Sequence, residues 1–383
     1  MNIAVPKETR TGERRVALVP ESCKKLAHMG YAISVEEGAG EAAFYPDGAY
    51  RDVGCAVERD PAAMMHSADL VLKIHPPAMD AAGRNEVEWM RPATVLLASL
   101  MPMRNLGIVR ALAARKITAF STDAIPRTTR AQAMDTLSSM ANIVGYTGAL
   151  LAAVELGRYF PMLMTAAGTV FPAKVFVIGA AVAGLQAIAT AKRLGAAITA
   201  TDVRPEVKEQ IESLGAKYVG IELKEHASAG GGYAKALSEE DALRQRALIA
   251  EQCAAVDVVI TTALIGGVFA PKLITAEMVR KMRPGSIIVD LGADGGGNCE
   301  LSRPGDTVMT NGVKIIAPVN LPSTMPTHAS LLFSRNLTAF VQAFTKDKMF
   351  QQDPSDDIQK SSLLTHDGEV VHPRVKEALE KAG

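Results

Sequence analysis

The stretch that decides the fold is KVFVIGAAVAGLQAIATAKRLGAAITATDVR, residues 174–204. A run of Val, Phe and Ile leads into a glycine-containing turn, an alanine-rich helical pattern and a second β-rich run that ends at Asp202. Gly179 and Gly184 hold the first and third positions of a GxGxxG motif, and Ala181 holds the second. The glycines of this motif permit the turn, the approach of backbone to a pyrophosphate and the close packing of helix on strand. The order strand, turn, helix, strand, acid predicts a dinucleotide-binding βαβ unit.

The same stretch predicts which dinucleotide is bound. The Ala181 methyl should push the phosphates outward slightly, while the helix that begins near Val182 still offers backbone N–H groups and the positive end of its dipole. Asp202 follows the last glycine of the motif by 18 residues, where a carboxylate accepts hydrogen bonds from ribose hydroxyls and repels a 2′-phosphate. Val203 and Arg204 come next, and the arginine tempers that preference. We therefore predict NAD(H), against the alternative of an ordinary helix turn with a surface aspartate.

Strand and helix patterns alternate along the whole chain. Strands are predicted early at NIAVPKE, SADLVLKIHPP and ATVLLASLM, and later at AKVFVIG, VDVVITTALI, GSIIVDLG and VKIIAPVN. This alternation is typical of βαβ units in parallel sheets, and residues 130–157 are predicted as one long helix between the two series. We predict an α/β fold of two doubly wound Rossmann-like domains, the second inserted into the first. Residues 1–138 and 325–383 would form the discontinuous first domain, and residues 139–324 the second.

Two further loops are predicted at strand ends of the second domain. ITTALIGG, residues 260–267, places Ala263 and Leu264 after one strand, and GSIIVDLGADGGGN places Asp290 and Asp294 after the next. Ligands of doubly wound sheets bind outside the carboxyl ends of the strands. These loops should flank the nucleotide, although for any one of these residues a purely structural loop role fits equally well.

Composition narrows the class of protein. The chain has 383 residues with 41 basic and 41 acidic side chains, so no overall charge favours nucleic acid or an anionic membrane. Four scattered cysteines without a CxxC spacing favour reduced thiols over a zinc site or a disulfide framework, and no metal is predicted. The N-terminus lacks the apolar segment of a signal peptide, and no stretch reaches the ~20 uninterrupted apolar residues of a membrane span. A soluble polypeptide is expected.

At this point four segments carry a family resemblance: VPKETRTGERRVALVPE, PRTTRAQAMDTLSSMANIVGY, GGYAKAL and DLGADGGGNCELS. Together with the nucleotide motif they resemble the NAD(H)-binding alpha subunit of the proton-translocating nicotinamide nucleotide transhydrogenases, and the alanine dehydrogenases share that fold. The resemblance implies a Re/Si-specific NAD(P)⁺ transhydrogenase. In such an enzyme hydride passes directly between NADH and NADP⁺ bound on a partner subunit, and the transfer is coupled to proton translocation.

The resemblance also assigns a nicotinamide pocket to the RAQAMD segment. By it, Asp135 and Arg127 orient the carboxamide and ribose of NAD(H), Ser138 joins them, and Gln132 reaches toward the NADP(H) side. The alternative is an ordinary helix start with capping and i, i+4 pairs, in which Arg130 is the member expected to be purely structural.

A lid, partners and a location follow from the same resemblance. ASAGGGYAKALSEED, residues 227–241, contains Gly232 and Tyr233 and is expected to close over bound nucleotide, although a surface loop would have the same pattern. The chain is expected to form a homodimer and to meet NADP(H)-binding and membrane-spanning subunits, with no nucleic acid. Its expected location is the cytoplasm, peripheral on the inner (plasma) membrane through those subunits.

The alanine dehydrogenases supply the second hypothesis, an amino-acid dehydrogenase. Arg15 and Lys73 match their residues for the keto-acid carboxylate, and Asp294 matches an active-site aspartate. Their proton-transferring histidine would fall at Met101, and a thioether cannot move a proton, so the first hypothesis is favoured. His75, at a predicted strand end, is the one histidine here that could serve such a site. A third hypothesis is a non-catalytic NAD-sensing module, which would not need a second nicotinamide contact such as Gln132.

Overall fold

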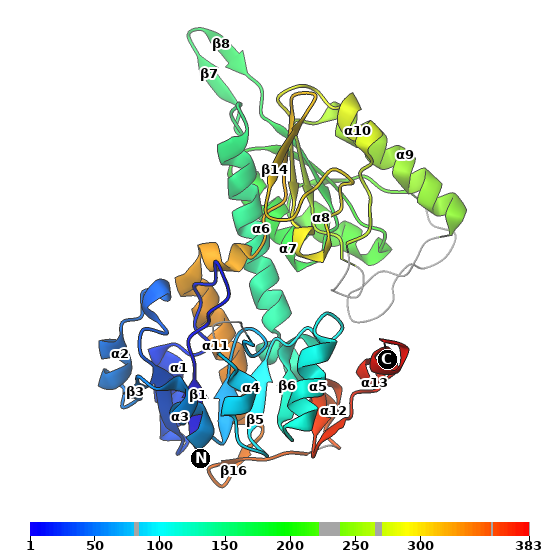
Figure 1. Cartoon of the computed structure of the whole chain (residues 1–383). Coiled ribbons are helices and arrows are strands. Elements are labelled where there is room, and N and C mark those ends of the chain that lie inside the picture. The colour runs from blue at the N-terminus through cyan, green and yellow to red at the C-terminus, as the bar shows by residue number, and fades with distance from the viewer. Residues whose placement is uncertain (80–83, 222–237, 265–269, 354, 383) are drawn as a thin grey trace. The chain divides into compact units, whose positions relative to one another are not determined.

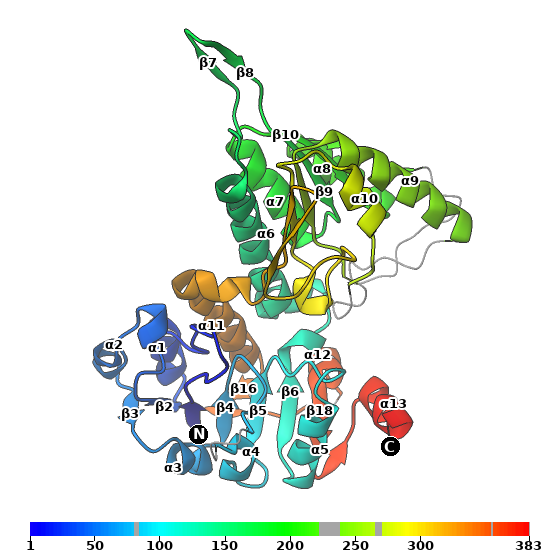
Figure 2. The same ribbon diagram turned by 45° about the horizontal axis from the view of Figure 1, so that its top comes forward.

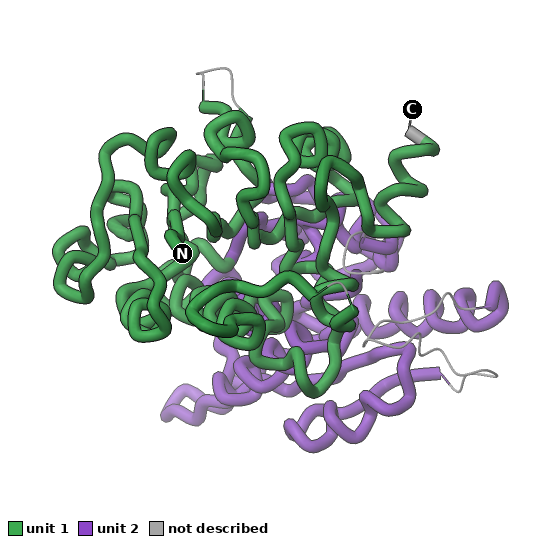
Figure 3. The backbone as a smooth tube through the Cα atoms, turned by 90° about the horizontal axis from the view of Figure 1, so that it is seen from below, with its two compact units in different colours: residues 1–140, 322–383 green, residues 141–321 purple. Residues whose placement is uncertain are grey.

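The structure is a computed structural model that describes residues 1–79, 84–221, 238–264, 270–353 and 355–382. It divides into two compact units (Figure 3), each described here by itself: unit 1 comprises Met1–Met140 and Pro322–Gly383, and unit 2 comprises Ala141–Leu321. The sequence prediction sets the domain boundaries at 138/139 and 324/325, and the division of the backbone sets the unit boundaries at 140/141 and 321/322.

Unit 1 is built on an eight-stranded sheet in the order β19-β18-β6-β5-β4-β1-β2-β3. From β3 to β6 neighbouring strands are parallel, and β18 and β19 extend the sheet antiparallel beyond β6. The chain starts at β1 and winds outward in both directions, which is the doubly wound pattern. The strands are β1 (Asn2–Val5), β2 (Ala32–Glu36), β3 (Ala56–Glu58), β4 (Leu70–Leu72), β5 (Val95–Ala98), β6 (Thr118–Ser121), β18 (Leu363–His366) and β19 (Glu369–Val370).

Helices cover both faces of this sheet. Ile3 and Val5 of β1 pack with the cluster that contains α1 and α11, whereas Ala4 packs with the cluster that contains α3 and α5. Alternate residues of one strand therefore bury opposite faces. The helices are α1 (Pro20–His28), α2 (Asp47–Asp52), α3 (Pro61–Ser67), α4 (Glu86–Trp89), α5 (Leu106–Ala114), α11 (Pro326–Ala343), α12 (Asp357–Ser362) and α13 (Pro373–Ala382), and a small hairpin of β16 (Thr345–Lys346) and β17 (Met349–Phe350) follows α11.

Unit 2 is built on a seven-stranded sheet in the order β11-β10-β9-β12-β13-β15-β14. All neighbours are parallel except β14 and β15, and the winding reverses between β9 and β12. The central strand β9 is apolar from Val175 to Ile178, as expected for a strand with both faces covered. The strands are β9 (Lys174–Ile178), β10 (Ala197–Thr201), β11 (Lys217–Tyr218), β12 (Val258–Thr261), β13 (Ile287–Asp290), β14 (Thr307–Thr310) and β15 (Val313–Ile316).

The helices of unit 2 also divide between two faces. Val175 and Val177 of β9 pack with the cluster that contains α6 and α7, and Phe176 and Ile178 pack with the cluster that contains α9 and α10. The helices are α6 (Thr136–Glu155), which enters from unit 1, α7 (Val182–Arg193), α8 (Lys208–Ser213), α9 (Glu239–Ala255) and α10 (Ala276–Lys281). The predicted α/β fold with two Rossmann-like units is confirmed.

The long helix predicted over residues 130–157 is wrong at its start. A 3₁₀ segment, η3 (Thr129–Met134), comes first, and α6 begins only at Thr136. Asp135 separates them because its ψ of 88° is not helical and its Oδ1 accepts the N–H of Ser138 at 2.8 Å. An aspartate that bonds the third N–H of the following helix is an N-cap, so the local capping signal outweighs the continuous apolar periodicity.

The helix α6 is long and apolar enough to cross a membrane by length and composition, with a mean hydropathy of 1.4. The core helix of a globular unit passes the same test, and α6 packs closely within unit 2. A Cβ added at Gly145 would lie 2.1 Å from the carbonyl oxygen of Ala183 in α7, and one at Gly148 would meet the side chain of Leu291 at 2.6 Å. These two glycines are points of close packing, while 28% of the apolar window of α6 is buried in the structure.

Candidate functional site

The turn after β9 has the geometry that a dinucleotide fold needs. Gly179 has a φ of +90°, which L side chains rarely adopt. A Cβ added at Gly184 would lie 1.9 Å from the carbonyl oxygen of Gly179, so the third glycine lets α7 start directly against the turn. The first and third glycines of the motif are therefore both required by backbone geometry.

Ala181, in the second position, sits in the turn without strain. It is the N-cap of α7, with φ of −77° and ψ of −166°, and no side chain caps the helix there. The N–H groups that begin with Val182 are thus available to an anion at the positive end of the helix. Alanine is compatible with this backbone, and its predicted effect on phosphate position stays a prediction.

Asp202 lies just beyond the carboxyl end of β10, where its carboxylate is held by its own chain. Oδ2 accepts the N–H of Ala180 at 2.8 Å, which ties β10 to the turn, and Oδ1 accepts the N–H of Arg204 at 2.9 Å. The Arg204 guanidinium closes on both carboxylate oxygens, with Nε at 2.9 Å and Nη2 at 2.8 Å. A ribose hydroxyl can reach this carboxylate only when the guanidinium moves away.

The loop after β12 lies at the same edge of the sheet as the turn after β9 and Asp202. Two residues that hold this loop in place were not predicted from the sequence. Thr262 donates its hydroxyl to the carbonyl oxygen of Gly179 at 2.9 Å, which fixes the loop against the turn. Asn298 holds both backbone groups of Ala263 through its side-chain amide. A threonine after a strand and an asparagine after three glycines are common loop residues, so neither carries a distinctive sequence signal.

The two aspartates near the end of β13 have different surroundings. Asp290 is fully buried and accepts hydrogen bonds from the hydroxyls of Thr261 and Ser302 and from the N–H groups of Gly292 and Cys299. It is a structural anion that shapes the loop. Asp294 is exposed and accepts the N–H of Asn320 at 3.4 Å.

The fit to a dinucleotide therefore rests on the carboxyl ends of β9, β10 and β12. The structure brings nine of the predicted cofactor residues together there, while Gly232 and Tyr233 lie outside the described residues. The nine are Gly179, Ala181, Val182, Gly184, Asp202, Val203, Arg204, Ala263 and Leu264. The left-handed turn, the uncapped helix start and the carboxylate at the second strand fit NAD(H).

Four of the predicted nicotinamide residues belong to unit 1: Arg127 precedes η3, Gln132 lies on η3, Asp135 follows it and Ser138 lies in the first turn of α6. Besides its capping bond, Asp135 accepts the hydroxyl of Ser138 through Oδ2 at 2.6 Å, and the Nε of Arg127 lies 3.8 Å from the same oxygen. Gln132 is exposed. Arg130 instead pairs with Asp356 and Asp357, in keeping with the structural role expected for it.

Arg15 and His75 meet at one buried carboxylate in unit 1. The Nη2 of Arg15 and the Nε2 of His75 both lie 2.6 Å from Oε2 of Glu13, and Ser323 donates its hydroxyl to Oε1 at 2.5 Å. Burial alone would raise the pKa of Glu13, but the hydrogen bonds from Arg15 and His75 outweigh it and hold that pKa well below its usual range. His75 is thus a partner of the Glu13 carboxylate.

Lys73 is enclosed by two carboxylates of the same unit. Its side chain is 1% exposed, and its Nζ lies 3.4 Å from Glu8 and 3.1 Å from Glu86. Burial by itself would lower the pKa of Lys73, but the two glutamates outweigh burial and raise it. The lysine is therefore a charged member of a buried ion cluster.

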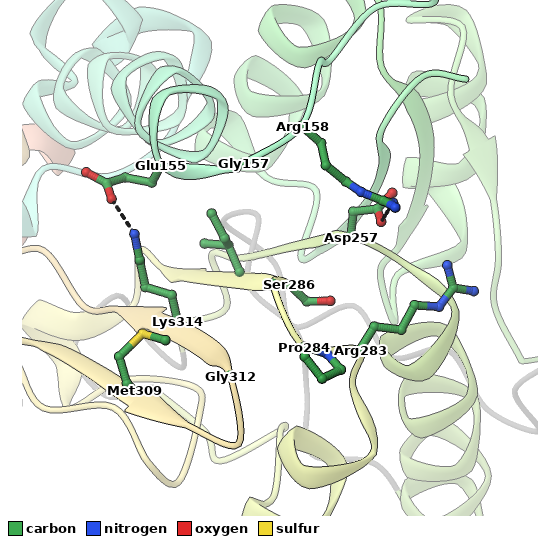
Figure 4. A pocket seen from close by; sticks show the side chains of 12 residues that line it. Glu155, Gly157, Arg158, Asp257, Arg283, Pro284, Ser286, Met309, Gly312 and Lys314 are labelled. Carbon is green, nitrogen blue, oxygen red and sulfur yellow. Dashed lines mark hydrogen bonds and ion pairs between the residues drawn. The ribbon is translucent and has the colours of Figure 1, made fainter. Parts of the chain in front are cut away.

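A cavity of about 420 Å³ in unit 2 lies away from this edge (Figure 4). It opens where β12, β13 and β15 begin, at the amino ends of the parallel strands, and ligands of doubly wound sheets bind at the opposite ends. Its charged side chains are partly paired, Lys314 with Glu155 at 2.8 Å and Arg158 with Asp257 at 2.7 Å (Figure 4). We assign the nucleotide to the carboxyl ends of the strands and not to this cavity.

The sequence is similar to known proteins over nearly its whole length. Residues 4–144 match the N-terminal domain and residues 148–373 the C-terminal domain of the alanine dehydrogenase/PNT family. An NAD(P) transhydrogenase alpha-subunit polypeptide of Rhodospirillum rubrum is 46% identical, over 97% of this chain and 98% of its own. Alanine dehydrogenase of Halomonas elongata is 29% identical, over 99% of this chain and 97% of its own.

Solved structures agree with the sequence relatives. The crystal structure of transhydrogenase from Sinorhizobium meliloti superposes with a TM-score of 0.87 at 42% identity and covers 97% of this chain and 100% of its own. A structure of L-alanine dehydrogenase superposes with a TM-score of 0.80 at 26% identity, covering both chains fully. With both of its domains matched, the chain belongs to the alanine dehydrogenase/PNT family.

Proposed function

We propose that this chain is the NAD(H)-binding alpha subunit of a proton-translocating NAD(P) transhydrogenase. The observation that carries the proposal is the fitted dinucleotide edge of unit 2, in a chain 46% identical to a transhydrogenase alpha subunit. Bound NADH supplies a hydride, which passes to NADP⁺ on a partner subunit. The Re/Si stereospecificity and the coupling to proton movement are included in the proposal and rest on the family resemblance.

The residues of this chain serve to bind and orient. The turn at Gly179 and the start of α7 hold the pyrophosphate, and Asp202 selects an unphosphorylated adenosine ribose. We assign the nicotinamide end to Arg127, Gln132, Asp135 and Ser138; Tyr233, which the family resemblance adds to this end, lies outside the described residues. Direct hydride transfer moves no proton at the reacting carbons, so these side chains are needed for position and for exclusion of water.

The partners follow from the same proposal. The acceptor nucleotide is bound by an NADP(H)-binding subunit, and membrane-spanning subunits conduct the protons. This chain would then work in the cytoplasm, attached to the inner (plasma) membrane through those subunits. It does not call for nucleic acid, since 41 basic and 41 acidic residues balance.

A homodimer is the proposed assembly, and an exposed apolar arm supports it. The arm, residues 159–171, contains the hairpin of β7 (Leu163–Thr165) and β8 (Gly168–Val170), which projects from the sheet of unit 2 (Figures 1 and 2). Met164 is 78% exposed and Phe171 is 79% exposed. An isolated two-stranded hairpin is at best marginally stable in water, and exposed apolar patches mark protein contacts. We propose that the arm contacts a second copy of this chain.

Sedimentation velocity tests the dimer. Changing Met164 and Phe171 together to serine should shift the chain from dimer to monomer. Met309→Ser is the matched control, because that methionine is 60% exposed on β14 of the same unit. A double variant that sediments as wild type would remove the arm from the interface.

Stopped-flow kinetics tests the activity. NADH and an analogue of NADP⁺ are mixed with the chain in the presence or absence of an NADP-binding transhydrogenase domain, and pyruvate with ammonium is the parallel acceptor. The proposal expects hydride transfer only when the partner domain is present. Oxidation of NADH by pyruvate and ammonium alone would establish the alternative, an alanine dehydrogenase-like enzyme that uses Lys73, His75 and Asp294.

A further inference from the structure

Asn298 lies behind the nucleotide edge of unit 2 and is fully buried. Its side-chain amide makes three hydrogen bonds to backbone. Oδ1 accepts the N–H of Ala263 at 3.1 Å, and Nδ2 donates to the carbonyl oxygens of Ala263 and Pro271, each at 2.9 Å. One side chain thus satisfies both backbone groups of Ala263 and fastens a second segment to them.

The backbone of Asn298 is fixed in turn. Its carbonyl oxygen accepts the N–H groups of Leu273 at 2.8 Å and Ile274 at 3.1 Å. The loop that contains Gly292 packs closely against this amide, because a Cβ added at Gly292 would lie 2.7 Å from Oδ1 of Asn298. The amide is held rigidly, and what it holds is the backbone at the end of β12.

The sheet order decides which half of the ligand this loop serves. A dinucleotide lies across the point where the winding reverses, here between β9 and β12, and the acid at the second strand takes the adenosine ribose. Asp202 follows β10, on one side of β9. Thr262 and Ala263 follow β12, on the other side, so the loop after β12 serves the half of the ligand remote from adenosine.

We infer that Asn298 is a positioning residue for the nicotinamide-ribose half of NAD(H), acting through the backbone of Ala263. The inference rests on the proposed function, since it requires that NAD(H) binds at this edge. Asn298 touches no reacting atom. It fixes the loop that does contact the ligand, and an unheld loop would have to be ordered at each binding event.

Isothermal titration calorimetry separates the two halves of the ligand. Asn298→Ala should raise the Kd for NADH about tenfold or more, since three hydrogen bonds that preorganise the loop are lost. The Kd for ADP, which lacks the nicotinamide half, should change less than about twofold, because the phosphate turn and Asp202 are untouched. A purely structural role would weaken both ligands together.

Gln359→Ala is the matched control. Gln359 is a buried amide of unit 1 that also joins two backbone groups, with Oε1 accepting the N–H of Asp353 at 3.0 Å and Nε2 donating to Gln351 at 2.9 Å. Its loss should lower thermal stability and leave both Kd values unchanged. Asn298→Ser provides a milder change of the same kind, with a smaller loss of NADH affinity.

Hydrogen exchange of the wild-type chain tests the inference without any variant. NADH should slow exchange of the amides of residues 260–264, and ADP should not. Equal Kd values for NADH in wild type and a folded Asn298→Ala, or equal protection by ADP, would overturn the inference alone. A wild-type chain that binds ADP and NADH with the same Kd would overturn it as well, and one that binds neither would overturn the proposed function.

Discussion

Asp135 has two separable roles in this structure, and two substitutions distinguish them. As the N-cap of α6 its carboxylate bonds the backbone N–H of Ser138 at 2.8 Å and the Ser138 hydroxyl at 2.6 Å. As the proposed nicotinamide ligand it supplies a charged acceptor beside Arg127. Asparagine caps a helix about as well as aspartate, and alanine does not cap at all. Asp135→Asn therefore removes the charge and keeps the cap, whereas Asp135→Ala removes both.

The two variants should differ in stability and agree in catalysis. Loss of the cap in Asp135→Ala should lower the free energy of unfolding by about 1 kcal/mol. In Asp135→Asn the pair with Arg127, 3.8 Å long and partly exposed, and the helix-dipole interaction together contribute below about 1 kcal/mol. Both variants should slow single-turnover hydride transfer by about 10- to 100-fold, the cost of a misplaced reacting group, with a modest change in NADH affinity.

Stopped-flow transfer to the NADP-binding partner domain gives the rates, and denaturant unfolding gives the free energies. Asp60→Ala is the control, because Asp60 caps α3 of the same unit by accepting two backbone N–H groups at 3.0 Å. It should be destabilised like Asp135→Ala and transfer hydride at the wild-type rate. A wild-type rate for Asp135→Asn would refute the reasoning, since Asp135 would then be only a cap.

Three other contacts lead to predictions of their own. Asp202→Ala should weaken NADH binding and reduce selectivity over NADPH at least about tenfold, because the Arg204 guanidinium loses the carboxylate that neutralises it; unchanged selectivity in fluorescence titrations would remove that role. Gly184→Ala should abolish NADH binding or unfold unit 2, since its Cβ would lie 1.9 Å from a backbone oxygen, whereas Gly157→Ala meets nothing within 4 Å and should behave as wild type in the same titration. Glu13 has a lowered pKa when folded, so its stabilising contribution is present above the unfolded pKa of about 4.3 and is lost as the pH falls. The free energy of unfolding can be measured with urea from about pH 6 down to about pH 3. It should fall less steeply with decreasing pH in Glu13→Gln than in the wild type. Parallel pH dependences of the two proteins would contradict the role of that carboxylate.

The dinucleotide fold could be predicted from the sequence because its signals are local. The glycines, the Val/Ile strand and Asp202 fall within residues 174–204, and Gly179 and Gly184 are required by backbone geometry that acts over a few residues. The same local reasoning failed at residues 130–157, where apolar periodicity continued through a position at which Asp135 caps a new helix. Periodicity reports which face is buried and not where one helix ends and the next begins.

The surroundings of the charged residues could not be predicted, because they depend on pairs distant in sequence. Ser323 reaches Glu13 across 310 positions, and Lys73 is enclosed by Glu8 and Glu86 from separate elements. Asn298 binds Ala263 across 35 positions. No spacing rule links such pairs, and only the fold of each unit brings their members together.

The surroundings of these charged residues also help to choose between the two hypotheses, a transhydrogenase and an amino-acid dehydrogenase. A keto-acid site would need cations available to a carboxylate and a group that moves a proton. Here the Arg15 guanidinium and His75 share Glu13, and Lys73 lies between two glutamates at 1% exposure. Position 101, where the resemblance to alanine dehydrogenases would put a proton-transferring histidine, holds a methionine with φ of +43° whose backbone N–H is donated to Asp123. Hydride transfer between two nicotinamides needs neither a carboxylate-binding cation nor an acid–base group, so cations paired with carboxylates and a methionine at position 101 are compatible with the proposed transhydrogenation.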